Sequence, residues 1–285
     1  MKRLWHHMTQ GSGWLGLIGA ALLLVFVLLA LLGPFLDLPD PTRGNLRARM
    51  APPTWSWFSL GAHPLGADQL GRDILSRIIA GSRVTLLIAG SAVLLGGVVG
   101  TLLGLVSGYF GGIFDRLLMR LVDIQLALPL MLLALMIVAA LGPSLTNLII
   151  VLALVSWVRY ARIVRGQVLA VRERDFVQSA RAIGASPARI ILKHILPNVL
   201  TPALVVATLE LARLIVMEAG LSFLGLGVQP PFPSWGRMLA DGRAYISSAW
   251  WVITFPGLAL MMTVLAVNLL GDWLRDVFDP RLGRQ

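Results

Sequence analysis

Six long runs of apolar residues divide the chain, with polar segments between them. The first run, Trp14–Leu36, contains no charged residue and covers about 33 Å as a helix, enough to cross a hydrocarbon core of ~30 Å. Its length favours a retained span over a cleavable signal peptide, whose apolar part is shorter. The other five runs are Val84–Tyr109, Leu117–Leu141, Leu145–Val158, Val199–Leu221 and Trp250–Leu270. We therefore predict an all-α polytopic membrane protein with six transmembrane helices.

The amino-acid composition agrees with a chain embedded in lipid. Hydrophobic residues make up 57% of the sequence and charged residues 13%, whereas a soluble domain has about 25% charged residues. The chain has no cysteine, which excludes disulfides and thiolate metal sites. The four histidines, His6, His7, His63 and His194, do not have the spacing of metal ligands on one face, so we expect no metal site.

The distribution of basic residues predicts the orientation of the chain. Lys and Arg number 24 against 14 Asp and Glu, a net charge of +10. In so apolar a chain this surplus indicates loop charges that orient the spans rather than a nucleic-acid partner. With the N-terminus inside, fourteen basic residues fall in inner segments and eight in outer segments. We therefore expect both termini to be cytoplasmic.

The spans divide the chain into three parts. Residues 1–60 hold the N-terminal tail, the first span and the start of an outer loop. Residues 61–83 form an outer amphipathic segment, in which Leu70, Ile74 and Ile78 recur every four residues. This pattern predicts a helix that lies along the membrane interface or docks on the bundle of spans. Residues 84–285 form a core of five spans, interrupted by an inner loop at 166–198.

The inner loop contains residues that typically begin and end two short helices. Asp175 is placed to cap the first helix, with Gln178 as its capping-box partner three residues later, and Gly184 follows its end. Ser186 is placed to cap the second helix, which we expect Pro197 to stop. Two interpretations remain open: a surface helix pair that stabilises the span ends, or a rigid protrusion that a soluble partner grips.

A segment of this loop resembles the EAA loop of ABC importer permeases. It runs from Gln178 through Ser-Ala-Arg-Ala-Ile to Gly184, with Ile-Leu-Pro at 195–197 downstream, and Gln178 stands where the family usually has Glu. The resemblance implies a coupling helix that sits in a cleft of an ATP-hydrolysing subunit. The residues to which it assigns this coupling are Gln178, Ser179, Ala180, Arg181, Ala182, Gly184, Ala185, Ser186 and Arg189.

Two further segments, His63–Leu86 and Ser222–Arg243, resemble the C-type permease subunit of dipeptide, oligopeptide and nickel importers. The resemblance extends over residues 60–283 and implies the type I ABC importer permease fold in a bacterial inner membrane. It also implies three kinds of partner: a second homologous permease subunit, two ABC ATPase subunits and an extracytoplasmic substrate-binding protein. Dipeptides or oligopeptides are the expected cargo; nickel, haem, glutathione or another small ligand stays an alternative.

The sequence lacks the motif that would bind ATP. A Walker A loop needs Gly-x4-Gly-Lys-Ser/Thr, and the two lysines, Lys2 and Lys193, lie in other contexts. We therefore expect no enzyme activity and no cofactor in this chain, with ATP and Mg on the partner subunits. An intramembrane hydrolase would need a nucleophile and base at membrane depth, which the spans lack. A stand-alone secondary carrier often has repeated halves, which we do not find.

Charged residues within predicted spans are costly and mark candidate sites. Glu210 and Arg213 are three residues apart on one helical face, and Glu218 follows two turns later. Pairing with one another and lining of a translocation pathway are both open interpretations. Arg159, Arg162 and Arg165 follow the short fourth run, where we expect them to anchor the end of the span.

Two further features have a structural and a functional interpretation. In the second outer loop, Gln229, Phe232 and Trp235 lie among prolines and form either a rigid cap or a landing site for the binding protein. In the second span, glycine recurs every fourth residue, which lets another helix approach closely, as a static packing face or as a sliding contact. These glycines are Gly96, Gly100, Gly104 and Gly108.

Overall fold

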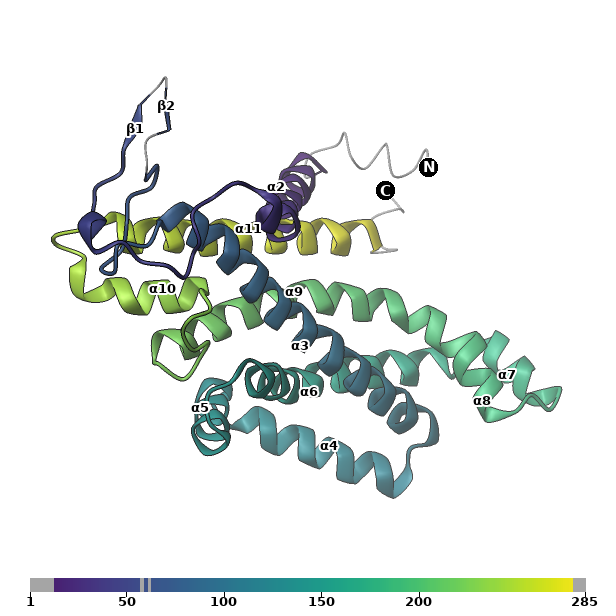
Figure 1. Cartoon of the computed structure of the whole chain (residues 1–285). Helices are drawn as coiled ribbons and strands as arrows, with labels where there is room; N and C mark the ends of the chain where they lie inside the picture. Colours follow the sequence, from purple (N-terminus) through teal and green to yellow (C-terminus); the bar gives the residue numbers. More distant parts are fainter. Residues whose placement is uncertain (1–12, 57–58, 61–62, 279–285) are drawn as a thin grey trace.

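The computed structural model describes residues 13–56, 59–60 and 63–278, and this part of the chain is mainly helical (Figure 1). The helices that could belong to spans are α2 (Gly13–Leu32, extended by the 3-10 turn η1, Gly33–Phe35), α3 (Ile74–Phe110), α4 (Gly112–Ala127), α5 (Leu130–Leu141), α6 (Leu145–Val171), α9 (Leu196–Phe223) and α11 (Trp251–Phe278). The shorter elements are η2 (Leu46–Ala48), the antiparallel strands β1 (Trp55–Ser56) and β2 (Ser59–Leu60), α7 (Asp175–Ala182), α8 (Pro187–Ile190), the π-helical turn η3 (Ile191–Ile195), α10 (Trp235–Gly242) and η4 (Arg243–Tyr245).

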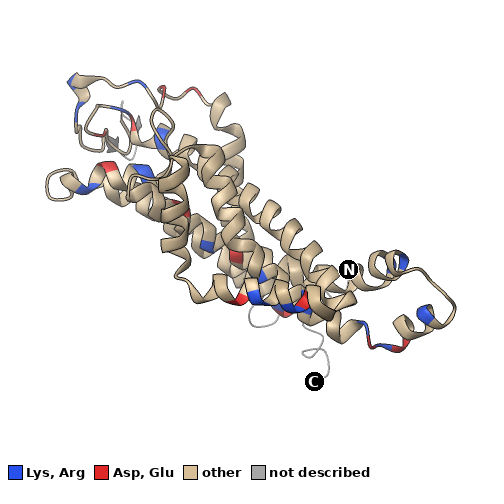
Figure 2. Ribbon diagram, turned by 90° about the horizontal axis from the view of Figure 1, so that it is seen from below, with Lys and Arg blue, Asp and Glu red and all other residues tan. Residues whose placement is uncertain are grey.

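Five segments of the described chain are long and apolar enough to cross a membrane, and a bent helix pair makes a sixth if it counts as one span. The five are Gly13–Phe35, Ile74–Phe110, Leu145–Val171, Pro187–Phe223 and Trp251–Phe278. Charged residues lie mainly in the loops and near the helix ends, and a smaller group lies within the helices (Figure 2). The predicted all-α polytopic class is confirmed.

The third predicted span is wrong in its shape. Instead of one helix over 117–141, α4 and α5 meet at an angle of 93°. Leu128 is extended (φ −85°, ψ 141°) because the ring of Pro129 disfavours helical backbone at the residue before it. With 16 and 12 residues, the two halves are about 24 and 18 Å long, so neither alone crosses a ~30 Å core.

The second span is longer than the apolar pattern indicates. The helix expected from Leu70 begins at Ile74, where the Asp73 side chain accepts a hydrogen bond from the Ser76 amide at 2.8 Å. It then continues without a break to Phe110, so the amphipathic segment and the span are one helix of 37 residues. Leu70 lies outside this helix and is exposed.

The first and last helices pack against each other. A Cβ at Gly16 would meet Trp273, and one at Gly19 would lie 2.7 Å from Leu269 Cβ, so small residues of α2 face the second half of α11. The start of α2 and the end of α11 therefore lie at the same end of the molecule (Figure 1). α7 and α8 also lie at one end of the long helices, with α10 and the β1–β2 hairpin at the other (Figure 1).

Candidate functional site

The glycine stripe of α3 lies directly against α6. At Gly96 and Gly100 a Cβ would collide with Ser156 and with the carbonyl of Trp157. At Gly104 it would lie 2.7 Å from the carbonyl oxygen of Ala161, and at Gly108 2.8 Å from Val168 Cβ. All four glycines therefore allow the two helix backbones to approach more closely than any side chain would permit.

Residues 175–195, which we call the elbow, comprise α7, the turn at Gly184, α8 and η3. Gly184 has φ +78° and its amide donates to the Arg181 carbonyl at 2.9 Å, the left-handed helix end for which glycine is suited. The predicted capping box is wrong. Arg174 is the N-cap of α7, and the Gln178 amide nitrogen lies 3.3 Å from Glu173 Oε2 instead of turning back to Asp175.

The second half of the elbow does not end at Pro197. Ser186 accepts a hydrogen bond from the Arg189 amide at 3.4 Å and so caps α8, but η3 then runs directly into α9. Pro197 lies directly after the π-helical turn η3, at the start of α9, and the helical run continues through it. Pro187–Phe223 therefore forms one helical run of 37 residues that joins the elbow to a span.

The elbow has a buried side and an exposed tip. Val177 and Ala180 of α7 pack with Val168 and Val171 of α6 in a hydrophobic cluster. Ile183, at the turn, is 85% exposed. An apolar side chain so exposed next to a rigid turn suits contact with another protein. The coupling residues that the resemblance assigns do not include Ile183, although it lies inside the EAA-like segment.

Two arginines join the elbow region to the end of α3. Arg172 Nη1 donates to the carbonyl of Gly108 at 2.8 Å, and the guanidinium of Arg181 lies 5.2 Å from the centre of the Tyr109 ring. A guanidinium at the C-terminal end of a helix is stabilised by the exposed carbonyls there. No spacing in the sequence indicates these contacts, because they join positions far apart in the chain.

Glu210 lies between two arginines. Its Oε1 is 3.5 Å from Arg213 Nη1, as the i, i+3 spacing predicts, and 3.1 Å from Arg159 Nη1 on α6. The expectation that Arg159 anchors a span end is wrong. α6 continues to Val171, so Arg159 lies in the middle of the helix, where an ion pair offsets the cost of its charge.

Arg213 and Glu218 differ in their surroundings. Arg213 lines a cavity of about 590 Å³ between α5, α9 and α11. Glu218 has no exposed surface and accepts a hydrogen bond from the Ser222 hydroxyl at 2.7 Å. In this conformation the Glu218 side chain is enclosed by protein, and its place on a pathway stays a prediction.

Trp235 is also wrong as a candidate surface contact. It is 0% exposed, its indole nitrogen donates to the Ile78 carbonyl at 3.0 Å, and its ring makes an edge contact with Phe26. Phe232 in the same loop is exposed. Gln229 is half-buried, and its amide donates to the Gly225 and Gly227 carbonyls at 3.2 and 3.0 Å.

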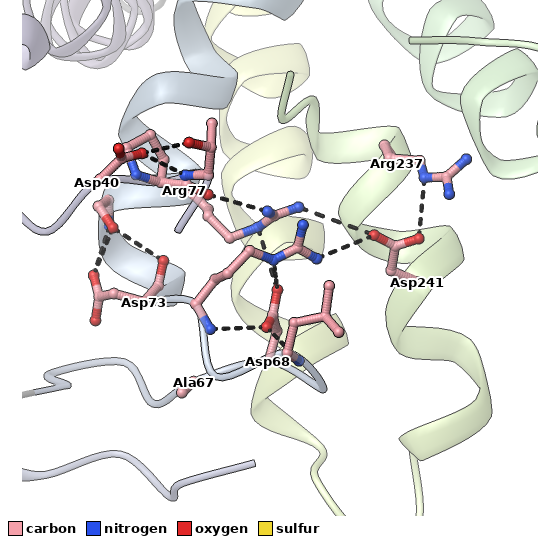
Figure 3. A network of polar contacts seen from close by, with 12 residues as sticks. Asp40, Ala67, Asp68, Asp73, Arg77, Arg237 and Asp241 are labelled. Carbon is pink, nitrogen blue, oxygen red and sulfur yellow. Dashed lines mark hydrogen bonds and ion pairs between the residues drawn. The ribbon is translucent and has the colours of Figure 1, made fainter. Parts of the chain in front are cut away.

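An ion network that no pattern in the sequence indicates lies at the α10 end of the molecule (Figure 3). Asp68 Oδ2 lies 2.7 Å from Arg72 Nε and 3.5 Å from Arg77 Nε. Asp241 of α10 lies 3.0 Å from Arg237 Nε and also faces Arg72 and Arg77. The network therefore ties the start of α3 to α10.

Replacing Asp68 with asparagine should lower the free energy of unfolding by about 2 kcal/mol, because two buried arginines lose a shared anion while Asp241 still faces them. Thermal unfolding of the detergent-purified protein measures the effect. The matched control is Asp40→Asn, since Asp40 pairs with Arg43 at the surface, where ion pairs contribute little. An equal loss in both variants would contradict a structural role for the network.

Within the described residues, no cluster of three or more His, Asp or Glu could hold a metal ion. His63 lies 3.2 Å from Asp73 Oδ1, and the ring of His194 lies beside Phe176. His6 and His7 lie outside the described residues.

Known permease proteins match this chain along nearly its whole length. The di/tripeptide transport system permease protein DppC of Pseudomonas aeruginosa (strain UCBPP-PA14) is 44% identical over 99% of this chain and 92% of its own length. The dipeptide transport system permease protein DppC of Escherichia coli (strain K12) is 43% identical over 99% of this chain and 93% of its own length.

The fold has a counterpart among solved structures. A chain of the MetNI methionine ABC transporter, determined in inward-facing conformations, aligns with a TM-score of 0.56 and 23% identity, covering 71% of this chain and 97% of that chain. Residues 100–284 match the family described as the inner membrane component of binding-protein-dependent transport systems. The chain, a multi-pass membrane permease, belongs to this family.

Proposed function

We propose that this chain is a permease subunit of an ATP-driven importer that moves dipeptides or short oligopeptides across the inner membrane. The observation that carries the proposal is a sequence identity above 40%, over 99% of the chain, to permeases named for dipeptide and di/tripeptide transport. The continuous helical run from the elbow into α9 supports it, because an importer needs a mechanical link between an ATPase and its spans. Import of nickel or another small ligand is the alternative.

The proposed assembly contains a second homologous permease subunit, two ABC ATPase subunits and an extracytoplasmic binding protein. ATP and Mg bind to the ATPase subunits, and this chain hydrolyses nothing. Family membership supports the ATPase and the binding protein as partners. The number of copies of each subunit is part of what we propose.

The elbow is the proposed contact with an ATPase subunit. The exposed tip at Ile183 enters the partner, while the buried side of α7 holds the elbow on α6. The coupling residues in this proposal are Gln178, Ser179, Ala180, Arg181, Ala182, Gly184, Ala185, Ser186 and Arg189. Both chain termini lie on the same cytoplasmic side as the elbow, as the count of basic residues supports.

The opposite end faces the binding protein in this proposal. Phe232 is exposed there and offers an apolar contact, and Gln229 shapes the loop beside it through its bonds to Gly225 and Gly227. When ATP closes the ATPase subunits, the elbow moves with them and α9 moves with the elbow. The cavity at Arg213 then changes access from one side of the membrane to the other.

Purification of this chain from its native membrane in mild detergent tests the assembly. We expect a second permease and P-loop ATPases to co-purify, and we expect the cognate binding protein to bind dipeptides. A chain that is isolated alone and moves solute in liposomes without ATPases would contradict the proposal and indicate a secondary carrier. A binding protein that binds a nickel complex but no peptide would contradict the peptide cargo alone.

A further inference from the structure

We propose that Arg213 forms a subsite for the carboxylate of the transported peptide. The inference rests on the proposed function, since it names the part of the cargo that the cavity between α5, α9 and α11 recognises. A free peptide C-terminus is a carboxylate, and a guanidinium binds carboxylates through charge-assisted hydrogen bonds.

The charge around Glu210 favours an anion. Arg159 and Arg213 approach the same Oε1 atom of Glu210, at 3.1 and 3.5 Å. Two guanidinium groups and one carboxylate leave one net positive charge around the buried Glu210, on two side chains that are partly exposed. Such a charge is costly within a membrane unless an anion or water meets it.

Exposure decides which charge a ligand meets. The Glu210 side chain is 2% exposed, whereas the Arg213 side chain is 30% exposed and lines the cavity. Arg213 Nη1 is itself buried and has no hydrogen-bond partner among the described residues, because its approach to Glu210 lacks hydrogen-bond geometry. A carboxylate in the cavity therefore meets the exposed part of the Arg213 side chain and not the buried Nη1.

The rest of the cavity suits a small peptide. Its volume of about 590 Å³ lies within the usual range of ligand sites, roughly 300–1,000 Å³. Asn268 of α11 is the other polar side chain of the lining and can bond to a peptide group. The remaining lining residues are apolar or small: Met131, Leu209, Ala212, Val216, Met217, Gly220 and Val264. One cation in an otherwise apolar cavity fixes the direction of the peptide and tolerates varied side chains.

Equilibrium binding to the purified permease–ATPase complex in nanodiscs, without binding protein, tests the subsite. The probes are radiolabelled alanyl-phenylalanine and its unlabelled competitors, the free acid and the C-terminal amide. We expect the acid to compete about tenfold better than the amide, as expected for a hydrogen bond to a charged group. Arg213→Gln should reduce this preference to near one, and Arg213→Lys should keep part of it.

Arg162→Gln is the matched control, because Arg162 of α6 pairs with Asp123, outside the Glu210 group, and does not line the cavity. Its preference for the acid should stay close to that of the wild type. No detectable binding, no preference in the wild type, or an equal loss in both glutamine variants would overturn the inference. Uptake of the same dipeptide by the complete transporter tests the proposed function separately. If the transporter takes up the dipeptide but binding shows no preference for the acid, the subsite is contradicted and the proposed function is not.

Discussion

Replacing Gly184 with proline is expected to reduce peptide uptake about tenfold or more, with ATP hydrolysis by the assembled transporter maintained. Gly184 has φ +78°, and proline fixes φ near −65°, so the turn between α7 and α8 must change its direction. The tip at Ile183 is then displaced relative to α9. Uptake and ATPase activity measured in the same proteoliposomes give the ratio of the two.

Gly184→Asn is the control for this variant, because asparagine tolerates the left-handed conformation better than other non-glycine residues. It should retain most of the uptake. Charge reversal at Arg181 should uncouple in the same direction, since it removes the contact with the Tyr109 ring. Normal uptake by both Gly184→Pro and the Arg181 variant would count against the elbow as the coupling element.

Replacing Gly100 with leucine is expected to prevent stable accumulation of the protein. Even a Cβ at this position would collide with the Trp157 carbonyl and lie 2.6 Å from Tyr160 Cβ, so α3 and α6 must separate. Overpacking of this kind costs about 3 kcal/mol or more when backbone lies in the way. Membrane levels by immunoblot and thermal unfolding in detergent measure the loss.

Gly90 provides the comparison on the same helix. A Cβ there would meet nothing within 4 Å, so Gly90→Leu should accumulate like the wild type. If both leucine variants accumulate normally, the glycine stripe is not a close packing face. If neither variant accumulates, α3 tolerates no large residue at either position, and close packing on α6 does not explain the loss.

The elements that local patterns define were predictable, and those that depend on tertiary contacts were not. Apolar runs located the spans because lipid selects for hydrophobicity. The turn at Gly184 follows from a local backbone requirement. Pro129 is visible in the sequence, but an apolar run that continues on both sides hides the 93° bend.

The candidate sites divide in the same way. The i, i+3 pair of Glu210 and Arg213 is a property of one helix and follows from spacing. The second partner, Arg159, comes from another helix whose length the apolar run underestimates. Trp235 looked accessible because it follows three prolines, yet the start of α10 places it against α3, where its indole finds the Ile78 carbonyl. A single sequence contains no signal for such pairings between distant segments.

The unbroken length of α3 has a mechanical consequence. Its 37 residues extend about 55 Å, well beyond a ~30 Å hydrocarbon core, and no break divides them. Its first turn is tied to α10 through the ion network (Figure 3). Its last turn is held by the hydrogen bond from Arg172 to the Gly108 carbonyl. Because no break inside α3 can absorb it, a displacement at the elbow end is transmitted along the helix to the α10 end.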